Sequence, residues 1–177
     1  MLIVNNKWLL CIPLLLLAKN AQTSTLCAGT ENIAIRSTTP TSEFTDNGDG
    51  TVTHHTTGLM WQRCSLGQSW EGQDCVGSAI VDRWPFAQRY ARENTYANYS
   101  DWRLPNKNEL LSIVELRCYQ PAINKQIFPN TEVNGGYLSS SPYAHYSRLI
   151  WHVSFLDGVG SNNSYSNGHV RLVRDAR

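Results

Sequence analysis

Residues 44–61 read FTDNGDGTVTHHTTGLMW, and this stretch decides whether the fold is organised around a metal ion or around its own packing. Two aspartates, one asparagine and two glycines fall between Asp46 and Gly50, as they do in calcium-binding loops. An EF-hand loop with Gly50 at its sixth position would have Thr45 at its first position and Thr56 at its twelfth. Both residues are wrong for that loop, so only a weak, irregular calcium site remains as an alternative.

The same stretch fits a β-hairpin. Asn47-Gly48 and Asp49-Gly50 tolerate positive φ angles and lie between two β-rich segments. The hairpin would deliver the apolar residues 58–61 into the core. The adjacent His54 and His55 would point to opposite faces of a strand, so they cannot easily bind one metal ion together. The stretch therefore predicts a turn, with no metal and no cofactor.

The composition bounds the class of protein. A chain of 177 residues is one domain's worth and can bury a real core. Charged residues make up 16% of it and the formal net charge is +1, so nothing in this balance favours nucleic acid as a partner. Six tryptophans and eight tyrosines predict a core packed around large aromatics and a surface with stacking platforms.

The N-terminal segment has the pattern of a secretory signal peptide. Lys7 precedes the apolar run WLLCIPLLLLA at residues 8–18, which is too short to span a membrane comfortably. We expect a signal peptide over residues 1–21, a polar tail or linker over residues 22–42 and one domain over residues 43–177. A retained membrane anchor is the alternative. Cleavage would leave a periplasmic or secreted protein without membrane association.

Four cysteines remain after removal of the signal peptide and its Cys11: Cys27, Cys64, Cys75 and Cys118. An even number in a secreted chain indicates two disulfides, for which three pairings exist. The short loop between them favours Cys64–Cys75, which leaves Cys27 with Cys118, and the other pairings stay open. A zinc site with four cysteine ligands has little support, because the sequence contains no CxxC pair.

Two helices are expected in the middle of the chain. PFAQRYAREN at residues 85–94 begins with a proline suited to a first turn and repeats apolar residues four apart. The second helix starts after Asn106, which forms a capping-box pair with Glu109. It is expected to run to about Cys118, where Pro121 stops it.

The remainder of the chain is strand-like. Three candidate strands are GYLSSS at 136–141, LIWHVSFLDG at 149–158 and GHVRLVR at 168–174, and the last two alternate. GVGSNNSYSNG at 158–168 is expected to be a long polar loop. Helices in the middle and strands at both ends predict an α+β fold.

Several segments in order resemble one family: FTDNGDGTVTHHTTGLMWQRC, SDWRLPNKNEL, CYQPAIN, IFPNT, YLSSSPYA and HVRLVR. Together they look like the C-terminal domain of the Legionella collagen-like adhesin, over about residues 43–174. The segments RLPNKNEL and VRLVR are similar to elements of C-type-lectin-like and formylglycine-generating-enzyme folds. The resemblance implies a compact, disulfide-stabilised α+β domain of C-type-lectin-like type, with two helices and a twisted antiparallel sheet.

The resemblance also implies a role in binding. The adhesin domain is associated with sulfated glycans, with host or cell surfaces and with trimer formation. This chain has no collagen-like stalk, which leaves a homo-trimer in doubt, and it carries His54-His55 where relatives tend to have an acidic or amide residue. The expected partner is a glycan, acidic or sulfated, or another cell-surface polymer.

Two clusters are the candidate ligand-binding residues. Aromatic rings stack on sugars, amides exchange hydrogen bonds with hydroxyls, and the planar guanidinium of arginine matches sulfate. Arg171, Arg174 and Arg177 would add positive charge. Each cluster could equally be a solvated connection between strands. Neither calcium-lectin signature occurs, so binding should be calcium-independent. The clusters are Tyr143, His145, Tyr146 and Arg148, and Asn162, Asn163, Tyr165 and Asn167.

Two other classes of function remain as alternatives. An enzyme on a formylglycine-generating-enzyme-like scaffold would need two reactive cysteines in the C-terminal part, but no cysteine follows Cys118. Residues 139–141 are serines without a G-x-S-x-G elbow. His145, His152 and His169 would have to converge to form a metal site. We therefore expect a non-enzyme, with a structural partner-binding module of an envelope assembly as the further alternative.

Overall fold

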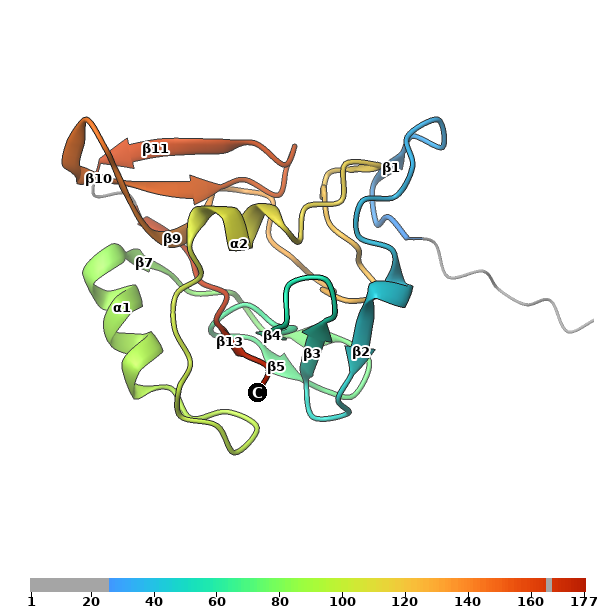
Figure 1. The fold of residues 1–177 in the computed structure, drawn as a ribbon, viewed down its shortest axis with the longest axis horizontal. Coiled ribbons are helices and arrows are strands. Elements are labelled where there is room, and N and C mark those ends of the chain that lie inside the picture. Colours follow the sequence, from blue (N-terminus) through green and yellow to red (C-terminus); the bar gives the residue numbers. More distant parts are fainter. Residues whose placement is uncertain (1–25, 165–166) are drawn as a thin grey trace, which may run out of the picture.

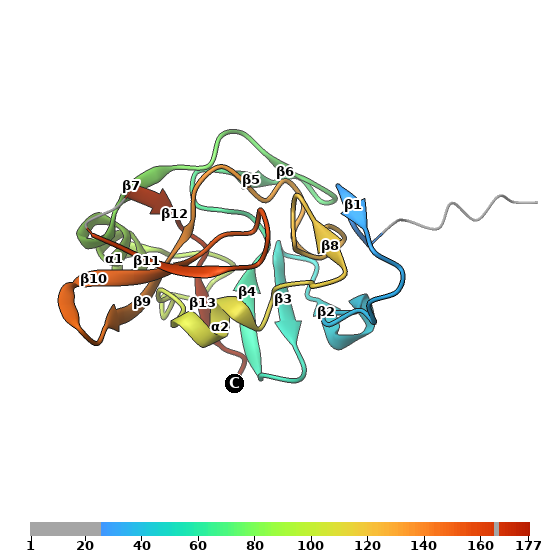
Figure 2. The same cartoon turned by 90° about the horizontal axis from the view of Figure 1, so that it is seen from above.

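The computed structural model describes residues 26–164 and 167–177. The expected signal peptide, Cys11 and Tyr165 lie outside the described residues. The described chain is α+β, as the sequence predicts, with two α-helices and mainly antiparallel sheets (Figures 1 and 2). Helix α1 is Trp84–Glu93 and helix α2 is Lys107–Leu111. No helix in this part of the chain is long and apolar enough to cross a membrane.

One four-stranded antiparallel sheet contains the predicted hairpin. Its strand order is β13-β4-β3-β2, and the strands are Val173–Asp175, Leu59–Gln62, Thr51–His54 and Phe44–Asp46. Asp46 Oδ1 accepts a hydrogen bond from Gly48 N at 2.9 Å, and Asp49 Oδ1 accepts one from Thr51 N at 3.0 Å. The carboxylates therefore close the turn between β2 and β3, and the hairpin is confirmed.

A five-stranded sheet holds the predicted ligand-binding clusters. Its order is β11-β10-β9-β12-β7, and the strands are Gly160–Ser164, Tyr146–Val153, Tyr137–Tyr143, Asn167–His169 and Val81–Arg83. All its pairings are antiparallel except β12 with β9. Two small sheets pair β1, Thr30–Glu31, with β8, Cys118–Tyr119, and β5, Ser69–Trp70, with β6, Cys75–Val76.

The first half of strand β9, residues 137–139, is buried on both faces. Tyr137 packs in one core cluster with Trp61, Phe128 and Phe155, and its neighbour Leu138 packs in a second cluster. The second cluster joins α1 to the chain before α2, through residues such as Ala91, Trp102 and Leu104. Consecutive residues of a strand point to opposite faces, so β9 separates the two clusters. Both core clusters therefore pack against this strand.

Three expectations about the elements were wrong. Helix α2 ends at Leu111 and not near Cys118, because the backbone of residues 114 and 115 pairs with residues 122 and 123. The stretch 158–168 is not a loop throughout, since residues 160–164 form edge strand β11 beside β10. The stretch 168–174 is not one strand, because the chain leaves β12 at His169 and enters the other sheet at Val173.

Both favoured disulfides are present. Cys64 bonds to Cys75 and Cys27 bonds to Cys118. Cys118 lies in strand β8 instead of the second helix. The Cys27–Cys118 bridge ties residues 26–43, which we call the N-terminal strap, to the domain.

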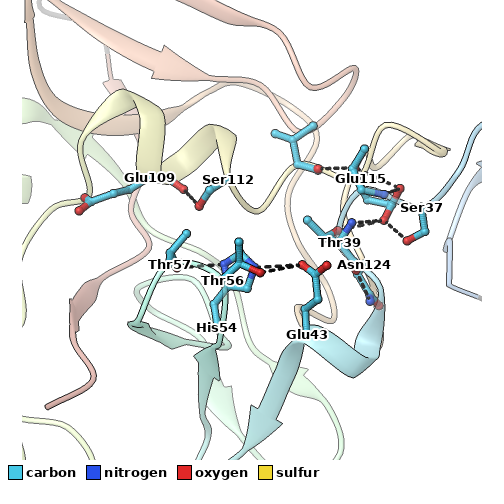
Figure 3. A network of polar contacts seen from close by, with 12 residues as sticks. Ser37, Thr39, Glu43, His54, Thr56, Thr57, Glu109, Ser112, Glu115 and Asn124 are labelled. Carbon is cyan, nitrogen blue, oxygen red and sulfur yellow. Dashed lines mark hydrogen bonds and ion pairs between the residues drawn. The ribbon is translucent and has the colours of Figure 1, made fainter.

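Glu115 also holds the N-terminal strap, by accepting hydrogen bonds from residues 37–39. This buried carboxylate accepts hydrogen bonds from Ser37 Oγ at 2.6 Å and from Thr39 N at 2.8 Å (Figure 3). It also accepts from Thr38 N at 3.0 Å and from Arg117 N at 3.0 Å. Burial acts to raise the pKa of Glu115, but these donors outweigh it and leave the pKa lowered. The strap is thus an ordered part of the fold from Leu26 onwards.

Candidate functional site

The first predicted cluster lies at the tip of a hairpin. Tyr143 ends β9 and pairs with Tyr146, which begins β10, so His145 lies in the turn between the two strands. Tyr146 is 68% exposed, and its ring is therefore available to a ligand. Arg148 follows in β10, two residues beyond Tyr146. The scaffold holds this short turn on two long strands, which is the arrangement expected of a binding loop.

The second predicted cluster lies mostly beside the first. Asn162 pairs with Trp151 and Asn163 pairs with Ile150 along the β10–β11 ladder. Edge strand β11 therefore brings both asparagines alongside the strand that carries Tyr146 and Arg148. Asn167 does not join them, because it lies in β12 and pairs with Arg83 on the other side of β9.

Trp151 and Lys107, which were not among the predicted ligand-binding residues, complete an aromatic surface. Trp151 is only half-buried, and its ring meets that of Tyr143 edge-on with 5.4 Å between the ring centroids. Lys107 Nζ lies 4.3 Å from the centroid of the Trp151 ring. The ring of His145 lies 5.7 Å from that of Tyr143. We call the four residues Tyr143, His145, Trp151 and Lys107 the aromatic ledge.

The start of α2 fixes Lys107 above the sheet. Asn106 Oδ1 accepts from Glu109 N at 2.9 Å and Asn106 N donates to Glu109 Oε2 at 2.7 Å, which is the predicted capping box. Lys107 N donates to Ser141 Oγ of β9 at 3.0 Å. The helix start is thereby attached to the strand that carries Tyr143. In the sequence, the capping box is the signal that indicates that Lys107 lies at the start of a helix.

The ledge combines two kinds of recognition. The rings can stack on the C–H faces of a sugar, and the ammonium can attract a sulfate or carboxylate. Lys107 makes no ion pair within the described part of the chain, where the salt bridges use His54, Arg63, Arg103, Arg117 and Arg174. Its charge is therefore open to an anionic ligand.

The C-terminal arginines contribute less surface charge than the sequence suggested. Arg171 is fully buried, and Arg174 is 6% exposed. Arg174 pairs with Asp101, with Nε 2.7 Å from Oδ1. Its pKa is raised, chiefly by that hydrogen bond. Both side chains are held inside the fold, because Arg171 lies in the buried link between β12 and β13 and Arg174 lies in β13.

The histidines make separate contacts and do not form a metal site. His152 Nε2 is 2.9 Å from Ser161 Oγ, and His169 Nε2 is 2.9 Å from Asn134 O. Burial lowers the pKa of His152, which favours its neutral form. Among residues 26–164 and 167–177, no group of three or more His, Cys, Asp or Glu side chains could hold a metal ion.

Ser139, Ser141 and the cysteines of the described residues are occupied by structural contacts. Ser139 Oγ donates to Trp151 O at 2.6 Å, and Ser141 Oγ accepts from Lys107 N. These bonds hold β9 to its neighbours. Each of the four cysteines in the described residues belongs to a disulfide, so none of them is a free thiol. Nothing in these contacts resembles an activated nucleophile.

Comparison with known protein families gives one match. The model of the Lcl C-terminal domain family matches residues 50–174, which is more than half of the chain. The match begins at the hairpin turn before β3 and includes the whole aromatic ledge. No curated protein matches the chain.

Proposed function

The chain belongs to the Lcl C-terminal domain family, and on that premise we propose that it is a non-catalytic binding domain for acidic or sulfated glycans at a cell surface. The family is associated with a collagen-like adhesin, so this chain contains an adhesin-associated domain. Two disulfides and this family fit a location outside the cytoplasm, which we propose is periplasmic or extracellular.

The aromatic ledge is the observation that supports glycan binding. It presents the rings of Tyr143 and Trp151 together with an ammonium that lies over the Trp151 ring, on residues held by α2 and by two long strands. Tyr146 pairs with Tyr143 of the ledge, and Asn162 and Asn163 lie on edge strand β11, which pairs with β10. Recognition of sulfate by one ammonium needs neither a metal nor a reacting group.

The alternatives have less support. An enzyme on a formylglycine-generating-enzyme-like scaffold lacks the reactive cysteine pair among the described residues. A structural module of an envelope assembly would use the same exposed surfaces, and capture of a protein partner instead of a glycan would favour it. Assembly as a homo-trimer stays a prediction.

Binding to sulfated and desulfated forms of one glycosaminoglycan tests the proposal. We expect the sulfated form to bind in low salt and more weakly at physiological salt, because salt screens exposed charges. Tyr146 pairs with Tyr143 of the ledge, and Tyr146→Ala should weaken binding about fivefold, since a stacked aromatic ring contributes about 1 kcal/mol. Tyr119→Ala is the matched control, because Tyr119 is 46% exposed on strand β8, away from the ledge. Absence of binding at either salt concentration, or equal effects of the two variants, would overturn the proposal.

A further inference from the structure

A pocket of about 400 Å³ is lined by none of the four residues of the aromatic ledge. It is lined by residues of α1, of the chain segment that leads into α2, and by Ser140 of β9. Ser140 lines the pocket, whereas its neighbour Ser141 binds the backbone of Lys107 below the ledge. The volume falls in the range of about 300–1,000 Å³ that is usual for small-ligand sites. The pocket is therefore a separate site and not part of the ledge.

The floor of the pocket is apolar. Ala91, Trp102 and Leu104 line it, and each is at most 4% exposed. Trp102 Nε1 already donates to Tyr96 O at 3.1 Å, so the indole offers carbon atoms and no free donor. A floor of this kind suits the C–H face of a sugar ring.

The charge at the rim is positive. Arg103 donates two hydrogen bonds of 2.8 Å to the carboxylate of Glu109, which also accepts from Asn106 N. The one carboxylate of the pocket is therefore neutralised and its oxygens are occupied. Arg92 is exposed and makes no ion pair within the described residues. Its guanidinium is the uncompensated charge and can bind a carboxylate through two parallel hydrogen bonds.

Three further polar groups face the pocket without a partner in the described part of the chain. These are the side-chain amide of Gln88, the Nδ2 group of Asn106 and the hydroxyl of Ser140. Amides and hydroxyls match the mixed donors and acceptors of sugar hydroxyls. A purely apolar carboxylate, such as a fatty acid, would leave all three desolvated and unpaired, which is unfavourable.

We propose that this pocket binds a single hexuronic acid unit. The ring lies on the floor formed by Ala91, Trp102 and Leu104, and its carboxylate pairs with Arg92. Gln88, Asn106 and Ser140 bind its hydroxyls. This inference rests on the proposed function in that the ligand is a glycan, but it assigns a second, carboxylate-specific site that does not involve the ledge.

Titration of the whole chain with methyl β-glucuronide and with methyl β-glucoside tests the site. The two sugars differ only in the carboxylate. We expect the glucuronide to cause saturable NMR shifts of the Gln88 and Asn106 side-chain amides at millimolar concentration, and the glucoside to bind at least tenfold more weakly. Arg92→Gln should remove the difference between the sugars. Arg89→Gln should preserve it, because Arg89 stacks on Phe86 of α1 and does not line the pocket.

The outcomes separate this site from the ledge. Equal affinity for the two sugars, or a preference that survives Arg92→Gln, would overturn the proposed pocket. Sulfated-polymer binding without glucuronide binding would also reject the pocket while the proposed function stands. Glucuronide binding without any polymer binding would support the pocket and reject the proposed function of the ledge.

Discussion

Arg171 is a buried cation that is held by rings and hydroxyls instead of a carboxylate. Its Nη2 donates to Thr131 Oγ1 at 2.9 Å, and its guanidinium lies 4.7 Å from the Phe128 ring and 5.3 Å from the Tyr137 ring. Its Nε and Nη1 atoms have no hydrogen-bond partner in the described residues. Burial lowers the pKa of Arg171 and its proximity to Tyr137 opposes this effect. The planar cation is therefore stabilised mainly by aromatic faces.

Substitution of Arg171 should show that the shape of its side chain contributes more to the free energy of unfolding than its charge does. Arg171→Met removes the desolvated charge and keeps most of the volume, so we expect a loss of about 1–2 kcal/mol in the free energy of unfolding. Arg171→Lys keeps a compact, strongly hydrated charge that cannot stack, and should lose about 3 kcal/mol or more. Urea unfolding of both variants measures this order. A lysine variant at least as stable as the methionine variant would contradict it.

At the scale of an element, the two glycines of the turn between β2 and β3 differ in how closely side chains surround them. Gly48 and Gly50 both have positive φ angles, of 80° and 85°. A Cβ atom on Gly48 would meet nothing within 4 Å, whereas one on Gly50 would collide with Tyr96 Oη and with the Trp70 ring. The two glycines therefore share the backbone requirement, and only Gly50 is also enclosed by side chains.

Alanine at the two glycines should separate backbone strain from steric overlap. Gly48→Ala should cost about 1 kcal/mol, since the left-handed conformation alone is unfavourable. Gly50→Ala should cost about 2 kcal/mol more, because Tyr96 or Trp70 has to move. Thermal unfolding of each variant, compared at one pH, provides the measurement. Equal losses would mean that the rings near Gly50 adjust freely.

The predictable elements were those with local signals. The hairpin, α1 and the capping box at Asn106 are specified by residues a few positions apart, and all three are present. The end of α2 depends on pairing of Val114 with Ile123, which no local pattern reveals. Strand β11 was missed because an edge strand can be polar, so its sequence resembles a loop.

The candidate site was predictable only in part, for the same reason. Tyr143, His145 and Tyr146 stand out as aromatics in a polar segment. Lys107 becomes relevant only when α2 packs on β9, and Trp151 only when the exposure of β10 is known. The pocket beside Arg92 combines α1, the segment before α2 and β9, which are distant in the sequence. Such sites require the fold before they can be recognised.

The whole molecule depends on the N-terminal strap. The family match begins at residue 50 and the sequence suggested a domain boundary at residue 43, yet residues 26–43 are ordered against the rest. The strap contributes the Cys27–Cys118 bridge and the donors that surround the buried Glu115 carboxylate. The folding unit should therefore extend to residue 26.

A chain that begins at residue 43 should be much less stable than one that begins at residue 26. The bridge spans 91 residues of sequence, and a loop of that size contributes about 4–5 kcal/mol in the chain-entropy model. Glu115 would in addition lose Ser37 and Thr39 as donors. The sum is comparable with the whole stability of a typical domain, about 5–15 kcal/mol.

Urea unfolding of three chains measures this effect. The first begins at residue 26, the second begins there but carries Cys27→Ala and Cys118→Ala, and the third begins at residue 43 and carries Cys118→Ala. The second chain keeps the donors to Glu115 and lacks only the bridge, so its midpoint should lie between the other two. A third chain as stable as the second would show that the strap acts only through its disulfide, and one as stable as the first would show that the strap is dispensable.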